Sequence, residues 1–98
     1  MYDVITVGSA TVDAFVKTEL SQMLYNRKKK ECIAYPVGSK ILIDDLNLTV
    51  GGGGTNTAVA LARLGHKVAF IGKTGYGENS RRVVNQLKKE KVDASLVV

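Results

Sequence analysis

A row of four glycines, Gly51–Gly54, followed at once by Thr-Asn-Thr, constrains this chain more than any other stretch. Glycine adopts positive φ readily and lets another molecule approach the backbone closely. A helical run of small residues, 58–64, comes directly behind the glycines and is closed by Gly65. Free N–H groups at a helix start attract polar ligands, and Thr55 or Asn56 can cap such a helix. The pattern favours a polar small-molecule pocket over a flexible turn that only lets the helix pack tightly.

An acidic residue follows the first predicted strand. Residues 4–7 are apolar and β-branched, which predicts a buried parallel strand that ends at Gly8. Residues 66–71 predict the next parallel strand. Loops at the carboxyl ends of such strands bind ligands in α/β sheets. Asp13 therefore has two roles that stay open: it accepts hydrogen bonds from ligand hydroxyls, or it is a surface acid or turn cap.

The stretch between Asp13 and the glycines predicts an antiparallel flap of short strands, because the apolar runs are joined by tight connections. Residues 31–35, 40–45 and 46–50 are the predicted strands, and residues 19–24 predict a helical turn. Beyond the second parallel strand, Ser80 is the predicted N-cap of a helix over 80–91 with Val83, Val84 and Leu87 on its apolar face, and 92–98 return to strand character.

Composition excludes several classes of function. The chain has 98 residues, which suits one domain or a piece of one, and its net charge is +5. The basic run 27–30 has no interleaved aromatic residue, which favours a solvated loop tip over a nucleic-acid contact. No apolar run reaches membrane length and no charged N-terminal signal is visible, which predicts no membrane partner. The single Cys32 excludes an internal disulfide framework and fits the cytoplasm.

Two polar features of the sequence are not predicted to be functional sites. His66 has no partner ligand in view, so a surface or capping role is favoured over a metal or catalytic one. Residues 72–75, Gly-Lys-Thr-Gly, are similar to the end of a phosphate-binding P-loop, but that motif needs a glycine where Lys67 stands.

Taken together, these residues resemble the N-terminal part of the ribokinase-like (PfkB) carbohydrate kinases, nearly end to end. The first strand with Gly8 and Asp13 resembles that family's first strand and its sugar-binding acid. The segment 51–58 with Ala-Arg-Leu-Gly at 62–65 resembles its N-terminal signature, and 70–75 resemble the strand and loop that follow. The resemblance implies an α/β fold, a Rossmann-like three-layer sandwich with a small β-sheet lid over about residues 14–50.

The resemblance also implies a sugar site and its residues. Asp13 would bind sugar hydroxyls, Gly51, Gly52 and Gly53 would let the sugar approach the backbone, and Asn56 would bind a further hydroxyl. The substrate would be a sugar or nucleoside, and ATP and Mg²⁺ would serve the full-length enzyme. Lids of this family often pair in dimers, and Ile41 and Ile43 would suit a homodimer through the lid.

Three departures and the length qualify this interpretation. Residues 75–80 lack the aspartate and the last glycine of the family's G-x-D-x-x-G motif. Gly53 stands where some members of the family have lysine. The segment 18–30 is longer than a simple lid hairpin needs. The anion hole, the catalytic aspartate and most of the ATP pocket belong to the family's C-terminal half. We therefore expect residues 1–98 to be the sugar-side portion of a kinase, inactive alone and binding neither ATP nor Mg²⁺. The alternative is a stand-alone binding or dimerisation domain derived from this fold.

Overall fold

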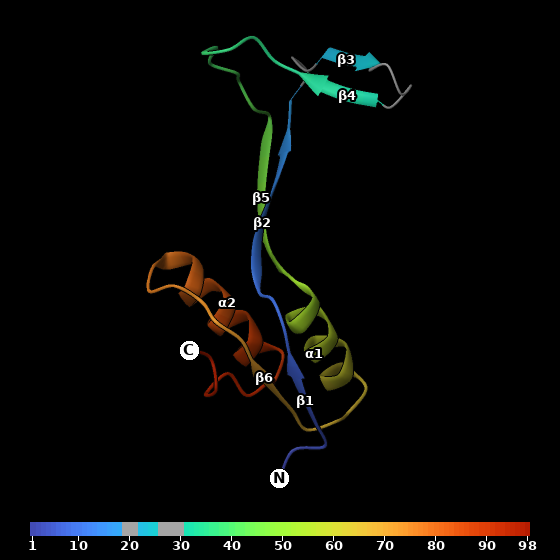
Figure 1. Cartoon of the computed structure of the whole chain (residues 1–98), viewed down its shortest axis with the longest axis vertical. Coiled ribbons are helices and arrows are strands. Elements are labelled where there is room, and N and C mark those ends of the chain that lie inside the picture. Colours follow the sequence, from blue (N-terminus) through green and yellow to red (C-terminus); the bar gives the residue numbers. More distant parts are fainter. Residues whose placement is uncertain (19–21, 26–30) are drawn as a thin grey trace. The chain divides into compact units, whose positions relative to one another are not determined.

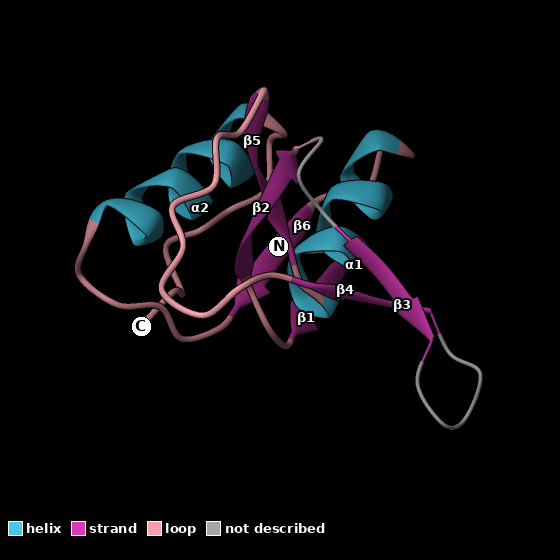
Figure 2. Ribbon diagram, turned by 90° about the horizontal axis from the view of Figure 1, so that it is seen from above, coloured by secondary structure: helices cyan, strands magenta, loops and turns pink. Residues whose placement is uncertain are grey.

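The computed structural model describes residues 1–18, 22–25 and 31–98 (Figure 1). These residues form two compact units, and we treat each by itself. The core unit comprises Met1–Asp13 and Leu48–Val98, and the strand unit comprises Ala14–Asn47. α1 and α2, labelled in Figure 2, belong to the core unit, whereas the described residues of the strand unit form strands and loops.

The core unit is built on two parallel strands. β1 (Val4–Val7) pairs with β6 (Val68–Ile71), in a register that places Val4 opposite Val68 and Val7 opposite Ile71. Both strands were predicted, because short β-branched runs bounded by glycine are typical of buried parallel strands. The predicted strand at 92–98 does not form as a continuous strand. Instead, Asp93 and Val97 make isolated parallel bridges with Ala69 of β6 and with Gly72.

Two helices cover one face of this sheet. α1 (Gly53–Arg63) packs against β1 and β6, and α2 (Glu78–Lys89) follows β6. In the core beneath them, alternate residues of β6 pack against the buried faces of both helices. This core consists of Ala58, Val68, Phe70, Val83, Leu87, Val92 and Ala94. Val83 and Leu87 are therefore core residues, as the sequence predicted.

Both helices start earlier than the sequence predicted. α1 begins at Gly53 with Gly52 as its N-cap, so neither Thr55 nor Asn56 caps it. α2 begins at Glu78 with Gly77 as its N-cap, so the prediction of Ser80 as a cap was wrong. The end of α1 was predicted well: Gly65 has φ +96°, its N–H bonds to Ala62 O, and the next N–H bonds to Leu61 O. That arrangement is a Schellman motif, which favours glycine because the left-handed region strains other residues.

Four strands lie in the described residues of the strand unit and its connections. β2 (Thr11–Lys17) pairs with β5 (Asp45–Gly51), and β3 (Gln22–Tyr25) pairs antiparallel with β4 (Glu31–Ala34). The predicted strands at 31–35 and 46–50 are confirmed. The predicted helical turn at 19–24 was wrong over 22–24, which lie in β3; residues 19–21 and the basic run 27–30 lie outside the described residues.

The predicted strand at 40–45 was also wrong over 40–44, since only Asp45 belongs to a strand, β5. Its apolar residues have strand composition, but they form no ladder in the part of the chain that the structure describes. Instead, Leu42 O accepts a bond of 2.9 Å from Thr18 Oγ1, and the Asp44 N–H donates to Lys17 O at 2.7 Å. Residues 14–47 fall inside the predicted lid of 14–50, and their role as a lid stays a prediction.

Candidate functional site

The start of α1 is held by a single residue of the loop after β1, Ser9. The N–H of Gly53 donates to Ser9 Oγ at 3.1 Å, and the N–H groups of Gly54 and Thr55 donate to Ser9 O at 3.1 and 3.3 Å. The next N–H, of Asn56, makes the first helical bond, to Gly52 O at 2.9 Å. The expectation of free N–H groups facing a ligand was therefore wrong at these positions, because Ser9 has already satisfied them.

Two of the four glycines are needed to bring Ser9 and β1 this close. Gly52 has φ +102°, and a Cβ on it would lie 2.5 Å from Ser9 O. A Cβ on Gly54 would lie 2.6 Å from Phe70 Cε2 and 2.8 Å from Gly8 C. These two glycines serve the packing of the fold, which explains part of the glycine row without any ligand.

Gly51 gives space to a candidate ligand residue. A Cβ on Gly51 would collide with Asp13 Oδ2, and it would lie 3.1 Å from Thr11 Oγ1. Thr11 Oγ1 in turn donates to Asp13 Oδ1 at 3.0 Å. Asp13 itself is exposed. Its carboxylate is thus held on one side by Thr11 and Gly51, and it can accept hydrogen bonds from a ligand hydroxyl on the other.

The remaining predicted site residues lie on the first turn of α1. Asn56 is exposed, and among the described residues its side-chain amide has no hydrogen-bond partner. Thr55 is buried, and its hydroxyl donates to Gly51 O and Gly52 O, so it is not available to a ligand. Asn56 can therefore both donate to and accept from a bound polyol.

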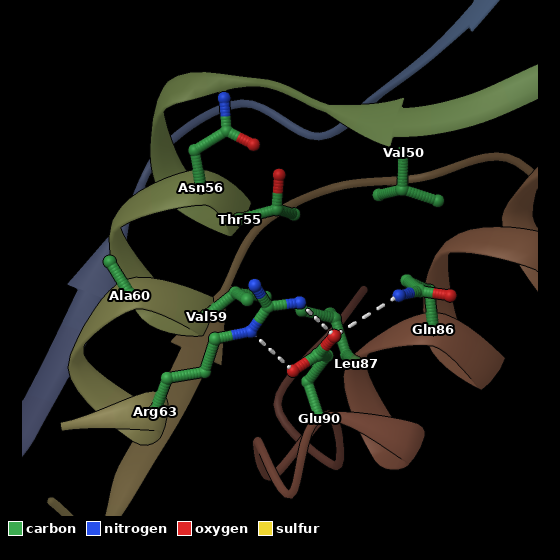
Figure 3. A pocket seen from close by; sticks show the side chains of 9 residues that line it. All are labelled: Val50, Thr55, Asn56, Val59, Ala60, Arg63, Gln86, Leu87 and Glu90. Atoms are coloured by element: carbon green, nitrogen blue, oxygen red, sulfur yellow. Dashed lines mark hydrogen bonds and ion pairs between the residues drawn. The ribbon is translucent and has the colours of Figure 1, made fainter. Parts of the chain in front are cut away.

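Asn56 lines a pocket of about 380 Å³ between α1 and α2 (Figure 3). The pocket is lined by Val50, Thr55, Asn56, Val59, Ala60, Arg63, Gln86, Leu87 and Glu90. At the end of α1, Arg63 Nε donates to Glu90 Oε2 at 2.9 Å and its second nitrogen lies 2.5 Å from Oε1. The hydrogen bonds and charge of Arg63 lower the pKa of the Glu90 carboxyl, and Glu90 raises the pKa of Arg63. This ion pair links Arg63 of α1 to Glu90 at the end of α2. Arg63 is the one basic residue that lines the pocket, so the lining contains no unpaired cation.

The structure brings the predicted residues together only in part. Asp13 contacts Gly51, and Gly51–Gly53 lead directly into the turn that carries Asn56. Asp13 and Asn56 share no hydrogen bond within the described ranges. Sequence reasoning missed Ser9, although a serine directly after the glycine that ends a parallel strand is a signal that could have pointed to it.

The described loop and helix start offer neither a cluster of metal ligands nor free N–H groups for a phosphate. The described parts of the chain contain no cluster of three or more His, Cys, Asp or Glu residues placed to hold a metal ion. The helix-start N–H groups that would receive a phosphate bond to Ser9 instead. In the same residues, neither helix has the length and apolar character needed to span a membrane.

The arrangement described so far, a parallel sheet with a glycine-rich helix start and a separate unit of strands, is that of an α/β protein with a candidate small-molecule site. Residues 3–98 match the family described as pfkB family carbohydrate kinase. The chain therefore belongs to the pfkB family of carbohydrate kinases, and its fold is ribokinase-like, as its residues predicted.

Individual relatives support the same assignment. The chain is 34% identical, over 94 residues, to a 5-dehydro-2-deoxygluconokinase of Clostridium perfringens, covering 96% of this chain and 23% of that protein. A PfkB protein from a Polaromonas species superimposes with a TM-score of 0.68 at 26% identity, over 100% of this chain and 27% of the other. Arabidopsis thaliana ribokinase, solved with ribose and ATP, shows the shared fold with a TM-score of 0.72 at 23% identity, over 95% and 26% of the two chains. The chain thus spans about a quarter of the length of these proteins.

Proposed function

We propose that this chain is the sugar-binding N-terminal part of an ATP-dependent carbohydrate kinase that phosphorylates a hydroxyl of a sugar, sugar acid or nucleoside. The observation that carries the proposal is the placement of an exposed carboxylate, Asp13, against Gly51, next to a helix start that exposes the free amide of Asn56. Family membership supports the chemistry, and the names of the relatives, a deoxygluconokinase and a ribokinase, support a polyol substrate.

Each side chain has a role in this proposal. The Asp13 carboxylate accepts hydrogen bonds from two substrate hydroxyls, and the Asn56 amide donates to one hydroxyl and accepts from another. Gly51, Gly52 and Gly53 let the sugar approach the backbone. Gly51 is buried beside Asp13 and Gly52 is half-buried beside Ser9, whereas Gly53 is exposed.

The transfer step requires groups beyond these residues. Phosphoryl transfer needs a positioned base and a cradle for the donor's phosphates together. The N–H groups at the start of α1 are already bonded to Ser9, and the family resemblance puts the anion hole in the C-terminal half, so we propose that ATP and Mg²⁺ bind to that half of the full-length kinase. We place this kinase in the cytoplasm, which the single cysteine supports.

The strand unit is proposed as both lid and dimer contact. It exposes several large apolar side chains, namely Phe15, Leu42, Ile43 and Leu46. Ile43 was predicted as a contact residue and is exposed, whereas Ile41 is half-buried and has less surface to offer. Exposed apolar surface of this kind is typical of interaction sites.

The test is a kinase assay on the protein encoded by the whole reading frame that contains this chain. We expect transfer of labelled phosphate from ATP, with Mg²⁺, to at least one member of a panel containing ribose, fructose, 5-dehydro-2-deoxygluconate and adenosine. The 98-residue chain alone should give no sugar-dependent transfer. A reading frame that stops after Val98, together with sugar binding or dimerisation without transfer, would instead support the stand-alone domain.

A further inference from the structure

A second cavity, of about 420 Å³, lies at the carboxyl end of the parallel sheet. Its walls come from the segment after β1, the loop after β6 and the first two turns of α2. Segments that follow parallel strands are where α/β proteins usually bind ligands. None of the residues assigned to the sugar site is among those that line this cavity. The cavity is therefore a candidate site of its own.

The cavity and the carboxylate of Asp13 lie on opposite faces of β2. Thr11 and Asp13 are bonded to each other on one face, and side chains alternate along a strand, so Val12 lies on the other face. Val12 packs with Ala10 and Val83 in the core unit, and these three side chains give the cavity an apolar wall. An apolar wall with a few polar groups is typical of small-molecule sites.

The opposite side of the cavity carries one positive charge. Lys73 is exposed and is the only charged residue that lines the cavity. Within the described ranges its ammonium group has no ion-pair partner. Lys73 belongs to the Gly-Lys-Thr-Gly stretch at 72–75, which lacks the first glycine of a P-loop. The structure therefore presents Lys73 as a single point charge at a cavity, without a P-loop around it.

Two uncharged donors stand on the first turn of α2. The amide of Asn79 makes no hydrogen bond in the part of the chain that the structure describes. Ser80 Oγ lies 2.7 Å from Thr74 Oγ1, and either oxygen can be the donor. When Thr74 donates, the hydroxyl proton of Ser80 is free for a ligand oxygen. Ser80 stands where the family's G-x-D-x-x-G motif has its last glycine, so this donor departs from the family pattern.

We propose that this cavity binds the anionic group of a small molecule, a carboxylate or a phosphate, with Lys73 as its counter-charge. An ammonium, an amide and a hydroxyl without any carboxylate form a set of donors that suits an anion. Asn79 and Ser80 donate to the oxygens of the anion, and the apolar wall contacts the rest of the molecule. The proposal goes beyond the proposed function, because Asp13 and Asn56 take no part in it. The anion belongs to an acidic substrate or to a separate small molecule, and the test distinguishes these two sources.

The test compares substitutions that remove one positive charge from the full-length kinase. Lys73→Met keeps the length of the side chain and removes its charge, whereas Lys73→Arg keeps the charge and should behave as the parent does. Lys88→Met is the matched control, because Lys88 is an exposed residue of α2 that does not line the cavity. Calorimetry measures binding of neutral ribose and of 5-dehydro-2-deoxygluconate, which carries a carboxylate. Thermal melts with inorganic phosphate, against chloride at equal ionic strength, measure binding of a free anion.

We expect Lys73→Met to melt as the parent does when no ligand is added, because its side chain is exposed. If the substrate carries the anion, this variant binds 5-dehydro-2-deoxygluconate about tenfold more weakly and ribose as before, since losing a hydrogen bond to a charged group has an effect of this size. If the anion is separate, phosphate raises the melting temperature of Lys73→Met less than that of Lys88→Met. Phosphate bound elsewhere in the kinase affects both variants alike.

Equal responses of Lys73→Met and Lys88→Met to both anions overturn the proposal. An equal loss of ribose and acid binding in Lys73→Met overturns it as well, because a counter-charge acts on the anion alone. Failure of the proposed function is a different result: the full-length kinase then transfers phosphate to no sugar, and the comparison of the two variants in phosphate still decides whether the cavity binds an anion.

Discussion

The carboxylate of Asp13 lies directly against Gly51, with no room for a side chain between them. The two residues belong to the paired strands β2 and β5, so the sheet fixes the acid relative to the glycine-rich loop. Thr11 adds a hydrogen bond of 3.0 Å to the same carboxylate. The acid is thus positioned before any ligand arrives, which lowers the entropic cost of binding.

Asp13→Ala should weaken sugar binding by the full-length kinase at least about tenfold, because desolvated hydroxyl-binding groups that lose a partner cost about 1–3 kcal/mol each. Asn56→Ala should weaken it more mildly, since an amide makes weaker hydrogen bonds than a carboxylate. ATP binding should change little in either variant. Titration calorimetry measures both ligands, with Asp44→Ala, from the strand unit, as the control. Unchanged sugar binding by Asp13→Ala would show that the predicted sugar site is wrong.

Ser9→Ala should destabilise the chain by about 1 kcal/mol, the usual cost of losing a side-chain acceptor at a helix start. The variant removes the acceptor of the Gly53 N–H but keeps Ser9 O, which holds Gly54 and Thr55. Urea unfolding followed by circular dichroism measures the change. Ser39→Ala is the control, because Ser39 Oγ bonds only to Pro36 O in an exposed turn. Equal stability of the two variants would mean that Ser9 Oγ does not stabilise α1.

The role of Ser9 shows where sequence reasoning stopped. The strands at 4–7 and 46–50 and the core positions Val83 and Leu87 could be predicted, because they follow from local apolar patterns. The start of α1 could not, because glycines have the lowest helix propensity of ordinary residues, and the bonds that hold them in a helix come from a distant loop. The prediction for residues 40–44 failed for the opposite reason: these residues have strand composition but form no strand in the described structure.

Lys91→Gly should stabilise the chain by about 1 kcal/mol. Lys91 follows the C-cap of α2 with φ +62°, a left-handed conformation that costs a residue with a Cβ about 1–2 kcal/mol. The following N–H, of Val92, bonds to Leu87 O at 2.9 Å, so the turn itself is well made and needs no rearrangement. Lys89→Gly, inside the last turn of α2, should do the reverse because it weakens the helix. Thermal melts of both variants measure this difference of sign.

Acid should remove the stabilising effect of the Arg63–Glu90 pair. Arg63 lowers the pKa of Glu90 in the folded chain, so the carboxylate is favoured by folding. Its contribution is therefore complete above the ordinary glutamate pKa of about 4.3 and is lost as pH falls through the lower folded pKa. The difference in melting temperature between the parent and Arg63→Gln should be constant from about pH 5 to 7 and should shrink below about pH 4. A difference that grows on acidification would contradict this assignment.

The chain of 98 residues should self-associate when it is produced by itself. Along β1, Thr6 is buried with its hydroxyl on Gly54 O, whereas Ile5 and Val7 are 47% and 74% exposed. Because side chains alternate along a strand, the two exposed residues share the sheet face opposite α1. Such apolar surface associates with itself in water.

Sedimentation velocity at several concentrations measures this association, and two variants identify the surface responsible. Val7→Thr keeps a β-branched residue on β1 but adds a hydroxyl to the exposed face, so it should reduce association. Leu42→Thr, in the strand unit, should reduce it only if the strand unit makes the contact. A compact monomer with a sharp, concentration-independent melt would refute both surfaces. A response to Leu42→Thr alone would assign self-association to the strand unit and leave the sheet face of β1 without a role in it.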